Sequence, residues 1–424
     1  MSISNGKIAA AQTGTGYIGE ITFRITGANG FIPVKNATIS ISLQGDQENI
    51  IEQVTTDESG LTENVYLSAP PFGYSMEPGQ NQPYTEYEIT VTAPGYKPAV
   101  VEGIEVLPDR LATQSVKLNP IEVGEIVPDS IFIPDHTLYG EYPPKIPEDE
   151  IKPMDESGEI VLNRVVVPEY IIVHDGVPND STARNYYVRY TDYIKNVASS
   201  EIYATWPEAA LYANILCIMS FTMNRVYTEW YRGKGYDFTI TSSTAYDQKW
   251  IYGRNTFRNI DVLVDSIFNN YLSRPGVSQP IFTSYCDGQR VTCDGLKQWG
   301  SKYLADQGYS AIEIIHNYYG SDMYINTADA ISGIPASWPG YDLTIGSSGQ
   351  KVRQLQQQLN RIARDYPAIP VIAVDGIFGN NTANAVRAFQ RIFGFPQTGV
   401  VDFPTWYGIS NIYVGVSRIA EPER

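Results

Sequence analysis

The sequence is short of the residues that build metal centres and thiol active sites. It holds three cysteines and three histidines in 424 residues. The histidines are His136, His174 and His316, so the chain before His136 offers neither an imidazole nor a thiol. A zinc hydrolase needs about three protein ligands, generally His with a carboxylate or Cys. This scarcity removes most metal and nucleophile schemes from the N-terminal part of the chain.

Positive charge and long apolar runs are scarce as well. Lys and Arg number 30 against 47 Asp and Glu, which gives a formal net charge of −17. Nucleic acid and an anionic membrane surface would both repel such a chain, so neither is expected as a partner. No segment reaches the about 18 apolar residues of a membrane span. The first residues, MSISNGKIAAAQTGTG, lack an apolar core, so we expect no secretory signal.

The three cysteines do not indicate an active-site thiol. Cys217 lies among apolar residues and is predicted to be inert core. Cys286 and Cys293 are close in the sequence and would form a disulfide if a hairpin joined them. The lack of an export signal argues against oxidation but does not exclude it, so the sequence leaves both states open.

Residues 1–118 are predicted to form an all-β sandwich. Segments 16–27, 37–45 and 87–96 alternate apolar and polar residues with period two, and Gly, Pro and Asn separate them. The stretches TTDESG (55–60) and APGY (93–96) resemble carboxypeptidase-regulatory-like β-sandwich modules. This resemblance implies a domain that is seldom catalytic.

Residues 119–164 are predicted to be an acidic, proline-rich linker with little means to form a core. The stretch carries a series of prolines among its acids: Pro120, Pro128, Pro134, Pro143, Pro144, Pro147 and Pro153. Loops of this composition are preferred sites of proteolytic nicking. We therefore expect an activating cut in this region.

Glu201 is the candidate catalytic residue of the centre, because it stands between two helical segments. The helix that follows, residues 209–226, is apolar on nearly every side and is predicted to be buried. Thr205-Trp206-Pro207-Glu208 has the spacing of a capping box. Burial beside such a helix raises a carboxyl pKa and suits Glu201 to general-acid work. Glu208 is the rival acid, with a capping role expected.

Four motifs in order give the centre, residues 165–335, a family resemblance. They are Glu201-x4-Trp206-Pro207-x-Glu208-Ala209, then Tyr246-Asp247-Gln248 with Tyr252-Gly253, then Phe282-Thr283-Ser284, then Gln298-Trp299-Gly300. This pattern resembles the stage II sporulation protein D (SpoIID) family of peptidoglycan lytic transglycosylases. The resemblance implies an α+β catalytic domain that cleaves MurNAc–GlcNAc bonds to 1,6-anhydro products, with Glu201 as the acid.

Family position also implies a set of substrate-binding residues. Hydrogen bonds to sugar groups are expected from Gln248, Ser284 and Gln298, and ring stacking from Tyr246, Tyr285 and Trp299. Some relatives bind zinc through Cys and His near the Asp-Gln segment, but STAYDQKWIYG has neither. We therefore predict no metal and no cofactor.

Residues 336–424 are predicted to hold a small α-helical domain and a C-terminal tail. Val352, Leu355, Leu359 and Ile362 line one helix face, and a second helix capped by Asn381 or Thr382 presents Ala385, Val386 and Phe389. With the run DGIFGNNT and the run AVRAFQ, this part resembles the type 1 peptidoglycan-binding domain.

The four parts together resemble the SleC family of spore cortex-lytic enzymes of anaerobic spore formers, and the likeness includes IPDHTLYGEYPPKIPE (133–148). The resemblance implies a zymogen located in the spore, near the cortex and coat. A subtilisin-like serine protease would remove its N-terminal segment during germination, and the enzyme would then degrade cortex peptidoglycan.

Two alternatives to this function remain open at this stage. One is an N-acetylmuramoyl-L-alanine amidase, for which Cys286 with His174 or His316 would be the candidate pair. The other is a non-catalytic protein that binds the wall or activates an amidase. Replacement of Glu201 by Gln separates them, because a pure binder would lose nothing.

Overall fold

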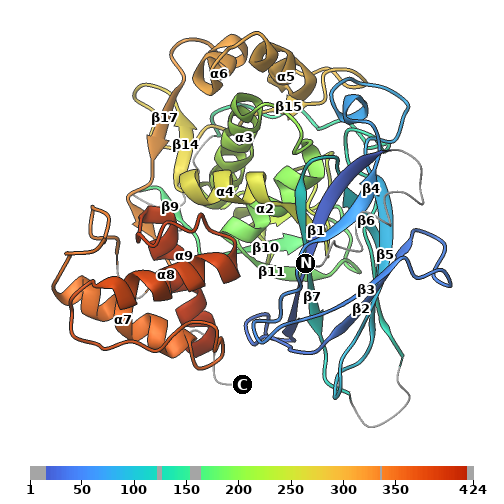
Figure 1. The fold of residues 1–424 in the computed structure, drawn as a ribbon. Coiled ribbons are helices and arrows are strands. Elements are labelled where there is room, and N and C mark those ends of the chain that lie inside the picture. Colours follow the sequence, from blue (N-terminus) through green and yellow to red (C-terminus); the bar gives the residue numbers. More distant parts are fainter. Residues whose placement is uncertain (1–15, 122–126, 153–163, 335–336, 418–424) are drawn as a thin grey trace.

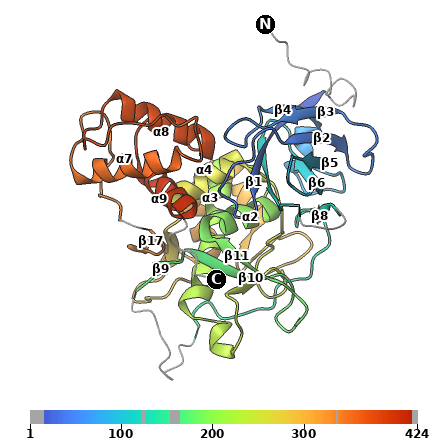
Figure 2. The same cartoon turned by 90° about the horizontal axis from the view of Figure 1, so that it is seen from below.

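The computed structural model describes residues 16–121, 127–152, 164–334 and 337–417. Strands form the N-terminal part, helices and short strands form the centre, and a group of helices forms the C-terminal part (Figure 1). In the view turned by 90°, the N-terminal strands and the C-terminal helices both lie against the centre (Figure 2). Within the described ranges, no helix is long and apolar enough to cross a membrane.

The N-terminal strands form two sheets, and the predicted period-two segments are confirmed as β1, β2 and β5. Along β1, Ile21, Phe23 and Ile25 are buried while the residues between them are partly exposed. The strands are β1 (Tyr17–Gly27), β2 (Thr38–Leu43), β3 (Glu52–Thr55), β4 (Val65–Ala69), β5 (Thr85–Thr92), β6 (Ala99–Val106), β7 (Leu111–Leu118) and β8 (Asp129–Phe132), with a 3-10 turn η1 (Phe72–Ser75). One sheet has the order β3-β2-β5-β6-β8. The other has the order β13-β7-β1-β4, in which β13 (Thr256–Phe257) comes from the centre.

The centre packs its helices around α3 (Glu208–Tyr227), which is buried along most of its length as predicted. The other helices are α2 (Tyr190–Glu201), η2 (Arg232–Lys234), α4 (Arg258–Ile267), α5 (Gln298–Asp306) and α6 (Ala311–Tyr319). The short strands are β9 (Val166–Val167), β10 (Tyr170–His174), β11 (Asn185–Arg189), β12 (Ile240–Thr241), β13 (Thr256–Phe257), β14 (Asn270–Ser273), β15 (Tyr285–Cys286), β16 (Leu296–Lys297), β17 (Tyr324–Thr327) and β18 (Ala330–Ile331).

The C-terminal part is built from α7 (Gln350–Ile362), α8 (Asn380–Phe393) and α9 (Phe403–Ser417). The predicted apolar faces of α7 and α8 are buried. The predicted cap of α8 is wrong, because Gly379 takes the N-cap position and makes no side-chain capping bond. Asn381 and Thr382, the two predicted caps, both fall inside the helix.

The N-terminal sheets are joined to the centre by a shared sheet edge. β13 of the centre pairs antiparallel with β7 of the N-terminal part. One sheet therefore contains strands from both of the expected domains. Next to β13, the side chain of Asn255 is fully buried and hydrogen-bonds to the backbone of β6. Its side-chain oxygen accepts from the Glu105 amide at 3.1 Å, and its side-chain nitrogen donates to the Glu105 carbonyl at 2.9 Å.

Asn255→Ala is therefore expected to destabilise the protein by about 2–4 kcal/mol. The change leaves a buried amide and a buried carbonyl of Glu105 without partners, and each costs about 1–3 kcal/mol. A lower midpoint in urea unfolding would measure the loss. Asn64→Ala is the control, because its side-chain bond to Glu20 lies on the surface. A change at Asn255 no larger than the control would contradict this account.

Residues 137–152, which we call the strap, lie along the centre. We expected the region 119–164 to be a linker with little means to form a core. The strap instead takes its buried contacts from the centre: the Thr137 amide donates to the Ser200 carbonyl at 3.0 Å, and the Ile146 amide donates to Ala245 at 2.7 Å. The expected cleavage region in part falls on residues 153–163, which lie outside the described residues.

Candidate active site

Glu201 is the last residue of α2, and its carboxylate is held by two donors. The side chain is 4% exposed. The Lys249 amide donates to Oε1 at 2.7 Å, and the Tyr285 hydroxyl donates to Oε2 at 2.6 Å. The carbonyl of the same residue accepts from the Gln298 side chain at 3.1 Å. The carboxyl group is thus fixed in one orientation by two separate segments, and a third segment holds the backbone of the same residue.

Burial raises the pKa of Glu201 above the ordinary value of a glutamate, since desolvation disfavours the charged form. The Lys145 ammonium and the two hydrogen bonds from Lys249 and Tyr285 act in the opposite direction. Burial is the largest of these effects, so the net direction is upward. A carboxyl group of this kind keeps its proton at a higher pH than a solvated glutamate does.

Gln248 positions the hydroxyl group that contacts Glu201. Its amide nitrogen donates to the Tyr285 hydroxyl at 3.2 Å and to the Ile218 carbonyl at 3.0 Å. Its amide oxygen accepts from Tyr193 and Thr222 at 3.1 and 2.8 Å. Gln248 is fully buried, and these bonds engage both ends of its side chain. We expected Gln248 to bind sugar, but in this structure its side chain is buried and orients Tyr285.

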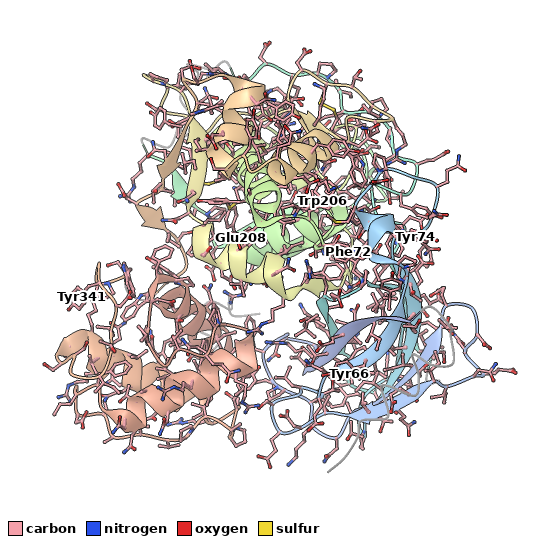
Figure 3. All side chains as sticks on the ribbon, turned by 45° about the horizontal axis from the view of Figure 1, so that its top comes forward. Tyr66, Phe72, Tyr74, Trp206, Glu208 and Tyr341 are labelled. Carbon is pink, nitrogen blue, oxygen red and sulfur yellow. A yellow bond between two sulfur atoms is a disulfide. The ribbon has the colours of Figure 1, made fainter. Side chains whose placement is uncertain are left out.

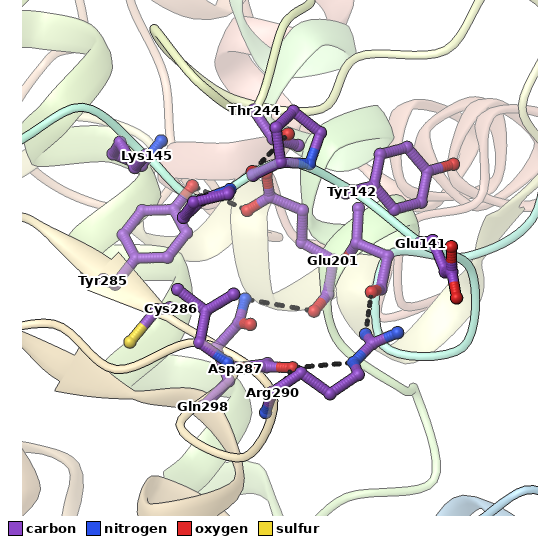
Figure 4. Close-up of a pocket in the computed structure, with 14 residues that line it drawn as sticks. Glu141, Tyr142, Lys145, Glu201, Thr244, Tyr285, Cys286, Asp287, Arg290 and Gln298 are labelled. Atoms are coloured by element: carbon purple, nitrogen blue, oxygen red, sulfur yellow. Dashed lines mark hydrogen bonds and ion pairs between the residues drawn. The ribbon is translucent and has the colours of Figure 1, made fainter.

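A cavity of about 370 Å³ opens over Glu201. Figure 4 shows its lining, in which Tyr285 and Gln298 both point toward Glu201. The strap forms one wall through Pro143, Pro144 and Lys145. The loop between β15 and β16 forms another wall and is held by its own ion pair, Arg290 with Asp287 at 3.0 Å.

Other members of the predicted substrate-binding set lie away from this cavity. Among the described residues that line it, Tyr246, Ser284 and Trp299 do not occur. Trp299 is 3% exposed and packs against Trp206 with ring centroids 4.9 Å apart. Trp299 therefore has a packing role in this structure. Of the six expected residues, the structure brings Tyr285 and Gln298 to the cavity, and Gln248 stands behind Tyr285.

The predicted capping box before α3 is wrong. Pro207 takes the N-cap position with no side-chain capping bond among the described atoms, and Glu208 is exposed at the first turn. Thr205 and Trp206 contact the N-terminal part instead: the Thr205 hydroxyl donates to the Ser75 hydroxyl at 2.8 Å, and the Trp206 indole donates to the Ser75 carbonyl at 2.9 Å. Figure 3 labels Trp206 and Glu208 of the centre and Phe72 of η1, the turn that also holds Ser75.

The structure adds residues that the sequence reasoning missed. Lys145 reaches the cavity wall, and its ammonium lies 5.2 Å from the centre of the Tyr285 ring. Burial lowers its pKa to about 8, with Glu201 and Asp247 opposing that shift. Lys145 falls inside the run IPDHTLYGEYPPKIPE that carried the family likeness, and this was the one signal in the sequence that pointed to it.

None of the three cysteines offers an exposed free thiol. Cys286 and Cys293 form a disulfide, while Cys217 is buried and its thiol pKa is raised to about 12 by burial. Within the described ranges, no group of three or more His, Cys, Asp and Glu side chains is placed to hold a metal ion. The Cys286 thiol of the amidase alternative is thus engaged in a disulfide.

The chain is similar to several solved structures over about a quarter of its length. Among solved structures, the chain is similar to the Bacillus anthracis TIE protein (18% identity, 25% of this chain and 17% of that one, TM-score 0.18). It is also similar to the minor pilin GBS52 of Streptococcus agalactiae (11%, 26% and 48%, 0.18) and to a catechol 1,2-dioxygenase of Acinetobacter radioresistens (13%, 29% and 60%, 0.19). It spans less than two thirds of each of these chains, and the TM-scores are too low to assign a shared fold.

The search of curated proteins found no match to this chain. A protein-family model described as a putative peptidoglycan binding domain matches residues 348–407. This range spans α7 and α8 and enters α9, so it covers the helices whose apolar faces were predicted from the sequence. Residues 348–407 are therefore a type 1 peptidoglycan-binding domain, which supports cell-wall peptidoglycan as a binding partner of this protein.

Proposed function

We propose that this protein is the zymogen of a spore cortex-lytic enzyme, and that its centre is a SpoIID-like lytic transglycosylase. The observation that carries the proposal is Glu201: a buried carboxyl group with a raised pKa, held by two donors at the wall of a cavity. The peptidoglycan-binding domain would hold the enzyme on its substrate, peptidoglycan. The N-terminal sheets would form a carboxypeptidase-regulatory-like sandwich. A serine protease would activate the chain in the spore.

One carboxyl group is enough for the reaction. Glu201 protonates the glycosidic oxygen as the bond from C1 of MurNAc breaks, and GlcNAc leaves as an alcohol. The C6 hydroxyl of the same muramic residue then bonds to C1 and gives its proton to the Glu201 carboxylate. The acid is regenerated, no water is consumed, and the product ends in 1,6-anhydro-MurNAc. A hydrolytic glycosidase would instead use a pair of carboxylates.

Mass spectrometry of the fragments released from purified cortex peptidoglycan tests the proposal. The recognition sequence of a site-specific protease is first introduced within residues 153–163 of the protein. The protein is cut there by that protease and is then added to the peptidoglycan. We expect anhydro-muramic ends. Reducing ends would indicate a hydrolase, and free stem peptides would indicate an amidase. Binding without any release would leave a wall-binding protein, which the domain at residues 348–407 would explain by itself.

Tyr285→Phe is expected to move the alkaline limb of the pH–rate profile to higher pH. Glu201 must be protonated to act, and the Tyr285 hydroxyl bond stabilises the charged form and lowers the Glu201 pKa. Loss of that bond raises the pKa, so the acid stays protonated over a wider range. Tyr246→Phe makes the same chemical change outside the cavity and should leave the limb in place. A limb that stays or moves downward would contradict the assignment.

A further inference from the structure

Arg225, Arg274 and Gln279 form a surface of the centre that we call the groove, and it contacts the strap as it would contact an extended acidic peptide. Gln279 bonds to the strap backbone in both directions: the Lys152 amide donates to its side-chain oxygen at 3.1 Å, and its side-chain nitrogen donates to the Lys152 carbonyl at 3.0 Å. The Phe282 amide donates to the Glu150 carbonyl at 3.0 Å. These bonds recognise main chain, which any extended peptide carries.

Two arginines of the groove bind two of the acidic side chains of the strap, Glu148 and Glu150. Arg225 donates to both oxygens of Glu148, at 2.9 and 2.6 Å, and Arg274 likewise contacts both oxygens of Glu150. Bidentate pairs of this kind are strong and directional. Asp247 holds Arg225 from inside the centre at 2.7 Å, so this arginine keeps a partner if the strap leaves.

The same strap places a side chain beside the catalytic carboxyl group. Lys145 donates to the Asp247 carbonyl, and its ammonium lies 4.7 Å from the ring centre of Phe221. Its charge acts on Glu201, as the opposing effect of Lys145 on the Glu201 pKa indicates. With Pro143 and Pro144, Lys145 lines the cavity that a glycan strand would need to enter.

We propose that the groove of Arg225, Arg274 and Gln279 is an exchangeable binding site for an extended acidic peptide, and that the strap fills it as an internal inhibitor that narrows the cavity at Glu201. This inference rests on the proposed function and deepens it. We assign the inhibition of the Glu201 site to residues 137–152 and not to the N-terminal sheets. A cut within residues 153–163 leaves the strap tied at one end only, so that it can leave the groove.

The test uses the full-length chain with Glu148→Gln and Glu150→Gln together. Both changes remove a charge from an arginine pair and leave the arginines in place. The control is Glu48→Gln with Glu63→Gln, which removes two exposed charges far from the groove in sequence. Hydrogen exchange at the amides of Ile146 and Lys152 reports the strap directly, and anhydro-muramic ends report activity before and after the protease cut.

We expect both amides to exchange about tenfold faster or more in the strap variant, because the segment opens more often. Release by the uncut variant should rise about tenfold or more over the uncut wild type, and the control should match the wild type. After the cut, all three chains should be equally active, which also shows that the variant is folded.

Three results would overturn the proposal, and they are distinguishable. Unchanged exchange would mean that the arginine pairs do not hold the strap. Faster exchange with an uncut variant that stays inactive, while the cut wild type is active, would mean that the strap does not block Glu201. A cut wild-type chain that releases no sugar fragments would overturn the proposed function and, with it, the inhibitory role.

Discussion

Glu201→Gln is expected to lower the rate of anhydro-muramic release by about 10²–10⁴-fold or more, because the amide has no proton to give the glycosidic oxygen. The fold should be unaffected. The amide oxygen of the new side chain still accepts from the Lys249 amide, and the amide nitrogen still reaches the Tyr285 hydroxyl. Single-turnover release from cortex peptidoglycan by the cut chain measures the effect.

Glu208→Gln is the matched control. It makes the same change seven residues further along the chain, where the side chain is exposed at the start of α3. We expect its rate to stay within about twofold of the wild type, as surface substitutions are generally neutral. Equal activity of the Glu201 variant and the wild type would end the transglycosylase assignment to this residue. Loss at Glu208 instead would transfer the role to the rival acid.

Asp247→Ala is expected to destabilise the centre by about 3–5 kcal/mol, the cost of removing one partner of a buried ion pair. The Asp247 side chain is fully buried. One carboxylate oxygen accepts from Arg225 at 2.7 Å, and the other accepts from Tyr231 at 2.7 Å and from the Thr241 amide at 2.9 Å. Alanine leaves all of these donors without this acceptor.

Urea unfolding followed by tryptophan fluorescence measures the loss, since Trp230 lies against Arg225 with the guanidinium 4.8 Å from its ring centre. Asp247→Asn keeps the shape and one acceptor, so we expect a smaller loss than with alanine. Asp294→Ala removes a carboxyl group outside the pair and serves as the control. A loss below about 1 kcal/mol for Asp247→Ala would mean that Glu148 alone compensates Arg225.

The local patterns of the chain predicted its elements well where burial is periodic. The alternation in β1 and the apolar faces of α7 and α8 follow directly from residue spacing, because one face of each element must be buried. Helix caps were predicted poorly. Pro207 and Gly379 take the cap positions, and the side chains expected there are used elsewhere or lie within the helix.

The site was predicted in part, for a physical reason that particular residues show. Glu201 was named because it precedes an apolar helix and because it matches the motif that carries the family resemblance. Tyr285 and Gln298 were named for sugar binding, but their observed bonds are to Glu201 itself. Lys145 and Arg274 could not be placed, because their partners lie far along the chain: Lys145 contacts Asp247, and Arg274 contacts Glu150.

The sequence by itself determined the periodic elements, the peptidoglycan-binding helices and the candidate acid, because these depend on spacing within one segment. Only the tertiary structure decided what surrounds the acid. A proline-rich acidic stretch has too little apolar surface to make its own core, so its sequence predicts a linker. In the folded protein the same stretch binds the centre through Glu148 and Glu150, since arginines from distant elements meet it there.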